Sequence, residues 1–337
     1  MAERTSIILE DGCGGELSRR LTRSVFLPAF PHRQLAELAD AAALDFGKEK
    51  LAFSIDSFVV SPLVFPGGDA GKLAVCGTVN DLAMRGARPL WLACAFIVEE
   101  GFEISLLRRL VRSLGSWAAR CGVEVVTGDT KVVPRGAADG LFITTCGLGT
   151  IDPRLNLGLD RIAPGDLVLV SGPIGDHGLA ILAAREKLDL RPLPRSDCAP
   201  LHRLVEGMAE SGADIKFLRD PTRGGLAAVL NEMVEGKGWG VEVGESALPV
   251  KPSTRAAVDL LGLDLLSLAN EGKLVAVVSS PGAKKLLKAM KVHPPARQAA
   301  VVGEVVAYPA GLALLRTSSG GKRVIDWPRG EPIPRIC

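Results

Sequence analysis

The 337-residue sequence lacks a charge imbalance and a long apolar run. Its formal net charge is only +2, so no basic surplus indicates nucleic acid as a partner. No apolar run reaches the roughly 18 residues that a membrane span needs. Residues 1–5 also lack the charged-then-apolar pattern that begins a secretory signal. We therefore expect a cytoplasmic protein that binds neither nucleic acid nor membrane.

Closely spaced cysteine pairs are also lacking. The seven cysteines form no C-x-x-C pair and are odd in number, which argues against a zinc site or a disulfide framework. Most lie among apolar neighbours, as small core residues do. Cys13, in a glycine loop, and Cys337, the last residue of the sequence, stand apart.

The common nucleotide and nucleophile motifs are missing as well. The glycine loop at residues 11–15 could bring backbone N–H groups to a phosphate, but no G-K-[S/T] follows it, so it is not a Walker A motif. The loops at 66–69 and 171–178 are equally compatible with simple turns. His177 is either an acid–base group or a turn cap. There is no nucleophile elbow and no dinucleotide fingerprint.

What the sequence does have is an unusual end. Residues 326–337 contain three prolines, which remove backbone donors and disfavour helix. A thiol at the end of an extended arm packs poorly but is well suited to move between sites. Cys337 is therefore either part of a frayed terminus or a carrier.

The remainder alternates strand-like and helix-like segments, which predicts an α/β (α+β) fold. The expected strands are 51–55, 123–127, 141–146, 167–170, a segment near 241 and 274–278. The expected helices are 71–86, 103–120, a segment from 179 and a segment through 232. The length favours two domains. We place a boundary near 152–154, giving domains 1–155 and 156–325 and a flexible tail 326–337.

A pattern of the form D-[S/T]-x-V-V occurs twice, beginning at Asp56 and at Asp129. Each copy follows an expected strand, so the two aspartates either share an acidic site or each begin a turn. Asp81 lies in an apolar helix and must face solvent or be paired, because a buried lone charge is costly. Aspartates without a His/Cys cluster fit magnesium and a nucleotide better than zinc or iron.

Five motifs in their order resemble the superfamily of aminoimidazole ribonucleotide synthetase, which includes selenophosphate synthetase and thiamine-monophosphate kinase. They are Asp56-Ser57, Gly77-Thr78-Val79-Asn80-Asp81, Gly128-Asp129-Thr130-Lys131, Asp220-Pro221-Thr222-Arg223-Gly224-Gly225 and Asn270-Glu271-Gly272-Lys273. Within that superfamily, residues 127–133 and the ending Pro334-Arg335-Ile336-Cys337 resemble the HypE family of hydrogenase maturation proteins. The resemblance covers essentially the whole chain.

The resemblance implies an ATP-dependent carbamoyl dehydratase. A HypF-type carbamoyltransferase would place a carbamoyl group on the Cys337 sulfur. ATP would phosphorylate the amide oxygen, and loss of phosphate and the N–H protons would leave a thiocyanate. The cyanide would then pass to iron on a HypC–HypD complex and become a ligand of the [NiFe] hydrogenase centre.

The resemblance also implies the residues that carry this chemistry. Cys337, Lys131 and Glu271 would be catalytic: Lys131 would stabilise charge or take a proton, and Glu271 would be the base for the amide nitrogen. The alternative for the last two is a simple ion pair between strands. The ATP site would consist of Asp56, Asn80, Asp81, Gly128, Asp129, Thr130, Asp220 and Thr222. Mg²⁺ would be held by Asp56, Asp81, Asp129 and Asp220.

The architecture implied by the resemblance is a two-domain aminoimidazole ribonucleotide synthetase-like fold. The N-terminal sheet would pair across a two-fold axis into a barrel, with nucleotide near that interface, and the C-terminal domain would be α/β. A homodimer is therefore expected.

The sequence departs from the family in its first loop, where Asp11 stands in place of the usual histidine and Cys13 in place of alanine or serine. Cys13 is compatible with an alternative, a selenophosphate synthetase, because the reactive cysteine of those enzymes lies in such a loop. The lysine expected next to that cysteine is missing here. A third hypothesis is a catalytically weak carrier of a one-carbon unit. Turnover that survives Cys337→Ala would indicate the selenophosphate synthetase. Function that survives Glu271→Gln would indicate the catalytically weak carrier.

Overall fold

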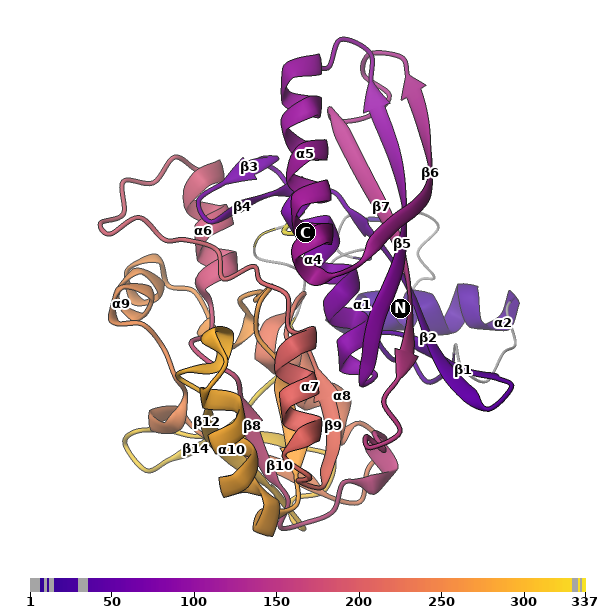
Figure 1. The fold of residues 1–337 in the computed structure, drawn as a ribbon. Coiled ribbons are helices and arrows are strands. Elements are labelled where there is room, and N and C mark those ends of the chain that lie inside the picture. The colour runs from indigo at the N-terminus through magenta and orange to yellow at the C-terminus, as the bar shows by residue number, and fades with distance from the viewer. Residues whose placement is uncertain (1–6, 9–10, 12–14, 30–35, 329–332, 334) are drawn as a thin grey trace.

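The computed structural model describes residues 7, 8, 11, 15–29, 36–328, 333 and 335–337. Two sheets, each with its own helices, make up most of the molecule (Figure 1). The helices are α1 Gly15–Leu21, α2 Leu27–Ala29, α4 Ala70–Met84, α5 Ile104–Cys121, α6 Asp176–Arg185, α7 His202–Glu210, α8 Gly225–Val234, α9 Pro252–Leu261 and α10 Ala283–Lys291. The expected α/β class is confirmed.

The first sheet has the strand order β1-β2-β7-β5-β6. Its strands are β1 Ala42–Phe46, β2 Glu49–Phe58, β5 Ala87–Glu99, β6 Glu124–Val133 and β7 Leu141–Ile151, and a separate short hairpin joins β3 Val64–Phe65 to β4 Gly68–Asp69. Only β5 and β6 pair in parallel, because α5 connects them as a crossover. Two strands therefore separate β2 from β6, which lies at the sheet edge.

Helix α4 covers one face of this sheet. The Asp69 carboxylate caps it by accepting a hydrogen bond from Lys72 N at 2.9 Å, and Gly86, at φ 71°, follows its end. Almost every residue of α4 is buried, since the sheet lies on one side and α5 and α7 on others. Gly77 permits the close approach to β2: a Cβ there would lie 2.7 Å from the Phe58 ring.

The opposite face of the first sheet carries exposed apolar side chains. Alternation along β2 places Ala52, Ser54 and Phe58 inward and leaves Phe53 and Ile55 exposed. Trp91 and Ile97 on β5 are exposed on this face as well. Val125, Val126 and Val132 are exposed on the edge strand β6. Isolated exposed apolar residues are ordinary, but a patch spread over neighbouring strands marks an interaction surface.

The second sheet has seven strands in the order β14-β13-β10-β12-β8-β11-β9. They are β8 Leu167–Val170, β9 Ile215–Arg219, β10 Gly240–Gly244, β11 Val275–Val278, β12 Ala300–Val306, β13 Ala313–Arg316 and β14 Lys322–Val324. Strand β11 is fully buried, and only β10 and β13 are parallel. Among the described helices, none is long and apolar enough to cross a membrane.

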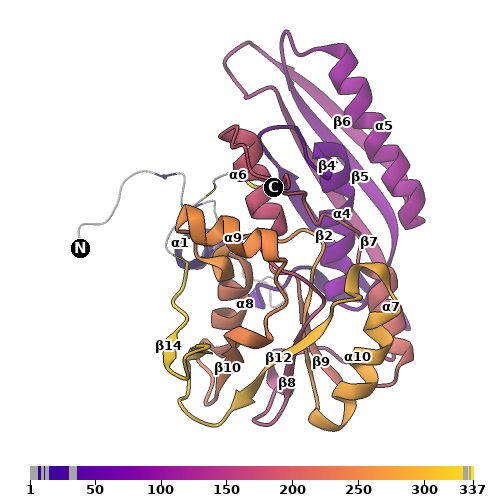
Figure 2. The same ribbon diagram turned by 90° about the vertical axis from the view of Figure 1, so that its left-hand side faces the viewer.

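The sequence placed most elements within a few residues of their observed bounds but ended two strands early. Asp56 and Asp129 were expected after their strands; both lie inside them, in β2 and β6. In the second copy of the repeated motif, Val132 and Val133 belong to β6, which runs on to Val133 because it continues to pair with β5. The end of the chain lies between the two sheets, near α4 and α6 in both views (Figures 1 and 2).

Candidate active site

A cavity of about 210 Å³ lies where the two halves of the molecule meet, and acidic side chains dominate its lining. Four separate segments supply aspartates: Asp40 precedes β1, Asp56 is in β2, Asp81 is in α4 and Asp220 follows β9. Gly77 also lines the cavity, one helical turn before Asp81, so this face of α4 points into it. The remaining lining residues are Ile55, Thr222, Arg223, Glu271 and Cys337.

Three of these carboxylates form a compact cluster. One oxygen each from Asp40, Asp81 and Asp220 lies within 4.8 Å of the others. Ser54 Oγ donates to Asp81 Oδ2 at 2.7 Å, which fixes the orientation of that carboxylate. The cluster consists of hard oxygen donors, the ligand type that magnesium prefers.

Crowding and burial raise the pKa of every aspartate in the cluster. Burial, reinforced by the charges of Asp220, Asp56 and Asp40, raises the pKa of Asp81 well above its usual value. Burial likewise raises the pKa of Asp40 well above its normal range, although Arg219 opposes it at 2.6 Å. The pKa of Asp220 is raised to about 6, mainly by burial. A cation placed here would relieve the repulsion.

Glu271 is the most isolated acid of the site. It is 2% exposed, and its Oε1 atom has no hydrogen-bond partner among the residues that the structure describes. Burial first, then the proximity of Cys198 and the acidic residues, raises the pKa of Glu271 well above its usual value. Such a carboxyl is suited to accept a proton from a bound substrate.

Asn80 holds the backbone that carries Glu271. Its Nδ2 donates to Glu271 O at 3.2 Å and to Ala199 O at 3.1 Å, while its Oδ1 accepts from Leu201 N at 2.8 Å. Asp197 Oδ1 accepts from Glu271 N at 3.1 Å. Asn80 was expected to bind nucleotide, yet its amide is engaged with the protein backbone.

Cys337 reaches the same cavity from the end of the chain. It is 6% exposed, and electrostatic attraction to it is the main cause that raises the pKa of Arg223. Arg223 Nη2 also lies 3.8 Å from Asp56 Oδ1. The cavity thus places a thiol, a guanidinium and a protonatable carboxyl together beside an acidic cluster.

Four of the predicted residues lie elsewhere in this chain. Gly128, Asp129, Thr130 and Lys131 are on the edge strand β6, two strands away from β2. Lys131 Nζ pairs with Asp129 Oδ2 at 2.8 Å, with both side chains more than half exposed. The hydrogen bond from Lys131 lowers the pKa of Asp129. The structure therefore does not bring these residues to the cavity within one chain.

Sequence reasoning missed Asp40 and gave Arg223 no role. Asp40 follows a Leu-Ala pair and precedes three alanines, a pattern that carries no chemical signal. Arg223 lies inside a motif that the resemblance singled out, so the sequence could have indicated it.

Two residues of the first loop were noted as departures from the family. Asp11 is buried, and its Oδ2 accepts from Ile8 N at 2.9 Å; Cys13 lies outside the described residues.

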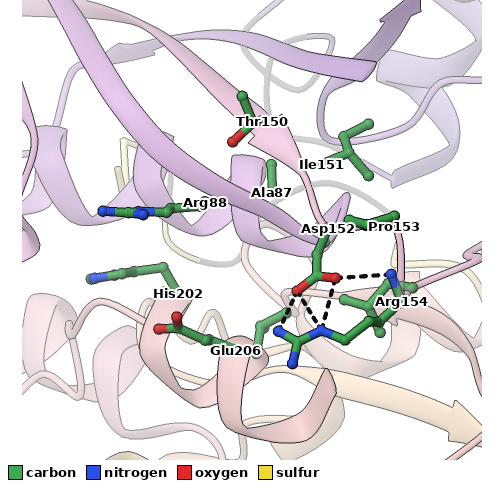
Figure 3. Close-up of a pocket in the computed structure, with 12 residues that line it drawn as sticks. Ala87, Arg88, Thr150, Ile151, Asp152, Pro153, Arg154, His202 and Glu206 are labelled. Carbon is green, nitrogen blue, oxygen red and sulfur yellow. Dashed lines mark hydrogen bonds and ion pairs between the residues drawn. The ribbon is translucent and has the colours of Figure 1, made fainter. Parts of the chain in front are cut away.

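A second cavity, of about 360 Å³, lies beside the first residues after β7 (Figure 3). Asp152 and Arg154 lie next to each other in its lining, joined by a 2.6 Å ion pair, and His202 and Glu206 of α7 line it as well. Burial lowers the pKa of His202 to about 4. Asp152 is already paired with Arg154. The lining of this cavity therefore offers no cluster of carboxylates comparable to that of the first cavity.

Comparisons with known proteins agree with this geometry. Residues 38–151 match the N-terminal domain of AIR synthase related proteins, and residues 163–311 match the C-terminal domain. The carbamoyl dehydratase HypE of Bradyrhizobium diazoefficiens is 48% identical over 330 residues, covering 98% of this chain and 95% of the relative. The HypE of Escherichia coli is 46% identical over 337 residues, covering 98% and 99%.

Solved structures extend the likeness to three dimensions. A HypE–HypF complex contains a chain that is 47% identical, with a TM-score of 0.87, covering 91% of this chain and 99% of that one. A HypE in complex with ATP is 46% identical, with a TM-score of 0.82, covering 98% and 100%. The expected fold and resemblance are confirmed, and selenophosphate synthetase is not favoured. The chain belongs to the AIR synthase related family and, within it, to the carbamoyl dehydratases named HypE.

Proposed function

We propose that this carbamoyl dehydratase acts on its own last residue, in the acidic cavity. ATP drives dehydration of an S-carbamoyl group on Cys337 to a thiocyanate, which supplies cyanide for the iron of a [NiFe] hydrogenase. The observation that carries the proposal is the presence of Cys337 in one cavity with Glu271 and Arg223. Binding of ATP is supported by the relative solved with ATP.

The reaction balances in two steps. The carbamoyl oxygen attacks the γ-phosphorus of ATP, releasing ADP, and the nitrogen gives up one proton as the C–O–P linkage forms. The second N–H proton then leaves as the C–O bond breaks, so phosphate departs and a C≡N bond remains on the sulfur. Because phosphoryl transfer depends mainly on positioning and charge neutralisation, the site needs a base and cations rather than another nucleophile.

Glu271 is the proposed base for the nitrogen protons. Its carboxyl lines the cavity with Cys337, and its raised pKa makes the carboxylate a stronger proton acceptor than an exposed glutamate. Arg223 is proposed to stabilise negative charge on the transferred phosphoryl group, because a guanidinium matches phosphate oxygens. Asn80 is proposed to position Glu271 through its backbone rather than to contact nucleotide.

Magnesium is proposed as the cofactor, held by Asp40, Asp56, Asp81 and Asp220. The donor set fits, since all four offer carboxylate oxygens and three lie within 4.8 Å of one another. When bound, Mg²⁺ neutralises phosphate charge. Thr222, at the rim of the cavity, is proposed as a further contact to the nucleotide.

A homodimer is proposed as the working unit, with Gly128, Asp129, Thr130 and Lys131 acting on the partner's site. The exposed apolar face of the first sheet and its edge strand β6 support a barrel formed with a second copy. In that arrangement Asp129 would add a carboxylate to the nucleotide site, and Lys131 a positive charge. The 61% and 70% exposure of their side chains leaves them available for this role.

Mixing two inactive variants tests this sharing of sites. In a mixed dimer of Lys131→Ala and Glu271→Gln subunits, one site receives an intact Lys131 from one subunit and an intact Glu271 from the other. We expect each variant alone to be inactive and random mixing to restore about a quarter of native activity, because half the dimers regain one of two sites. Mixing that restores nothing would place Lys131 in the site of its own chain, whereas an active Lys131→Ala variant would place it outside catalysis.

The partners are proposed from the same relatives. Delivery of the carbamoyl group by a HypF-type carbamoyltransferase is supported by the relative solved as a HypE–HypF complex. Transfer of cyanide to a HypC–HypD complex is proposed as the next step. A cytoplasmic location is proposed because six cysteines that the structure describes are thiols rather than disulfides, and thiols remain reduced there.

The domain limits remain a proposal of 1–155 for the ATP-binding and dimerisation domain, 156–325 for the second domain and 326–337 for a movable tail. The gap between the two family matches, at 152–162, supports the first limit. Pro328 packs near Gly15 and Gly224, which gives the start of the tail contacts with both halves.

The decisive experiment is intact mass after incubation with the carbamoyltransferase, carbamoyl phosphate and ATP. We expect the native chain to gain one carbamoyl group and, on addition of MgATP, to lose one water. Cys337→Ala should show neither change. Absence of any adduct on the native chain, with a transferase that modifies another HypE in parallel, would refute the role of Cys337.

A further inference from the structure

The end of the chain docks as a short antiparallel partner of the segment that follows β2. Val59 N donates to Cys337 O at 2.9 Å, and Ser61 N donates to Arg335 O at 3.3 Å. Arg335 Nε returns a hydrogen bond to Val59 O at 2.8 Å. Ile333 and Ile336 are each 2% exposed in the core. The thiol is therefore held by backbone pairing on one side and apolar burial on the other.

Two side chains of α6 complete this pairing. Arg185 Nη2 donates to Arg335 O at 2.9 Å and to Ser61 O at 2.7 Å, so one guanidinium joins the tail to the segment it pairs with. His177 Nε2 lies 2.9 Å from Ile336 O. The two residues are eight apart in one helix, which places them on the same face, about two turns from each other.

The surroundings of His177 fix its tautomer. A backbone carbonyl only accepts, so Nε2 must carry the hydrogen that it donates to Ile336 O. Nδ1, 2.7 Å from Ser196 Oγ, is then the acceptor, and Ser196 Oγ in turn accepts from Cys198 N at 3.0 Å. The edge of the imidazole meets Phe65 at a ring separation of 5.7 Å. In the docked state the Nε2 donor of His177 therefore points at the tail, and Ser196 holds the other side of the ring.

We propose that His177 and Arg185 are positioning residues that dock the loaded tail for dehydration. The inference rests on the proposed role of Cys337 as carrier. The hydrogen bonds described above reach the tail at the backbone carbonyls of residues 335 and 336, so these contacts suit a free, carbamoylated or cyanated sulfur. Because these contacts do not depend on the group that the sulfur carries, they can present that group to Glu271 and hold the tail until the reaction ends.

The dock must also release the tail. At 6% exposure the Cys337 thiol is out of reach of a partner enzyme while docked. Arg335 has a φ of 56°, in the left-handed region that non-glycine residues disfavour, so its backbone gains freedom when the tail leaves. Beside the backbone pairing and the burial of Ile333 and Ile336, two side chains of α6 supply docking bonds. Weakening those two should therefore shift the tail outward without altering the acidic cavity.

The first test measures how fast iodoacetamide alkylates Cys337, by intact mass of the full chain without partners or ATP. We expect Arg185→Ala to raise the rate about ten-fold or more, because hydrogen bonds from a charged donor are lost from the docked state alone. His177→Ala should act in the same direction, and His177→Gln, which retains an N–H donor, should restore part of the protection. Arg191→Ala is the matched control, since Arg191 pairs with Asp189 at an exposed site. Cys337→Ala identifies the adduct.

The second test loads each variant with carbamoyl and follows loss of water in a single turnover with MgATP. We expect Arg185→Ala and His177→Ala to slow dehydration about ten-fold, with carbamoylation by the transferase as fast as in the native chain or faster. A variant with native melting temperature but unchanged alkylation and dehydration would overturn the dock. The two proposals fail separately: if the native chain accepts no carbamoyl group, the carrier role is wrong, while alkylation still decides whether His177 and Arg185 hold the tail.

Discussion

Glu271→Gln is expected to leave the chain able to receive a carbamoyl group but unable to convert it to thiocyanate. Removing a general base costs about 10²- to 10⁴-fold in rate. Glutamine fills the same volume, so the buried site keeps its shape, and carbamoylation, which we propose occurs on the undocked tail, should be unaffected. The measurement is the single-turnover loss of water from the loaded chain, followed by intact mass.

The pH dependence of the native reaction provides a second test of the role of Glu271 as a base. A base must be deprotonated to act, and burial raises the pKa of Glu271 well above its usual value. The dehydration rate should therefore rise with pH, and this rise should occur at a higher pH than the titration of an ordinary glutamate. Glu304→Gln, an exposed carboxyl on β12, is the matched control. Thiocyanate formation at the native rate in Glu271→Gln would exclude this role.

The sequence sufficed for the parts of the site that come from contiguous motifs. Asp56, Asp81 and Asp220 were expected from the resemblance to act in one nucleotide site, and all three line one cavity. Asp40 was not predicted, since its place depends on Arg219 and on the route of the chain into β1. Such long-range pairing leaves no local signature.

The repeated D-[S/T]-x-V-V motif shows where pattern reasoning ended. The repeat correctly indicated two similar strands, but which strands are neighbours is decided by sheet order, and β7 and β5 lie between β2 and β6. A shared site for Asp56 and Asp129 therefore depends on a second copy of the chain. The docked tail was equally unreadable, because the backbone bonds that hold residues 335–337 require no particular side chains.

The acidic cluster is expected to cost stability in the absence of a cation, and Asp81→Asn should reveal the cost. Burial, then Asp220, Asp56 and Asp40, raises the pKa of Asp81 in the folded chain. The folded state therefore binds more protons than the unfolded state between the ordinary aspartate pKa and the raised value. Stability falls as pH increases through that window and stays lower above it.

At pH 8 in EDTA we expect Asp81→Asn to unfold at a temperature a few degrees higher than the native chain. Asparagine keeps an acceptor for Ser54 Oγ, so the local hydrogen bond survives. Calorimetry with and without MgCl₂ supplies the measurement. The native chain should be stabilised by Mg²⁺ and the variant much less, and the variant should lose dehydratase activity. Asp189→Asn, at an exposed ion pair, controls for the loss of one charge.

The opposite result would be equally informative. If Asp81→Asn melts at a lower temperature than the native chain in EDTA, and Mg²⁺ stabilises both to the same extent, the cluster is not a strained cation site. A gain in stability joined to a loss of activity instead means that repulsion among Asp40, Asp81 and Asp220 is retained because the reaction needs it. The same residues would then account for both the instability of the empty site and its affinity for a metal-bound nucleotide.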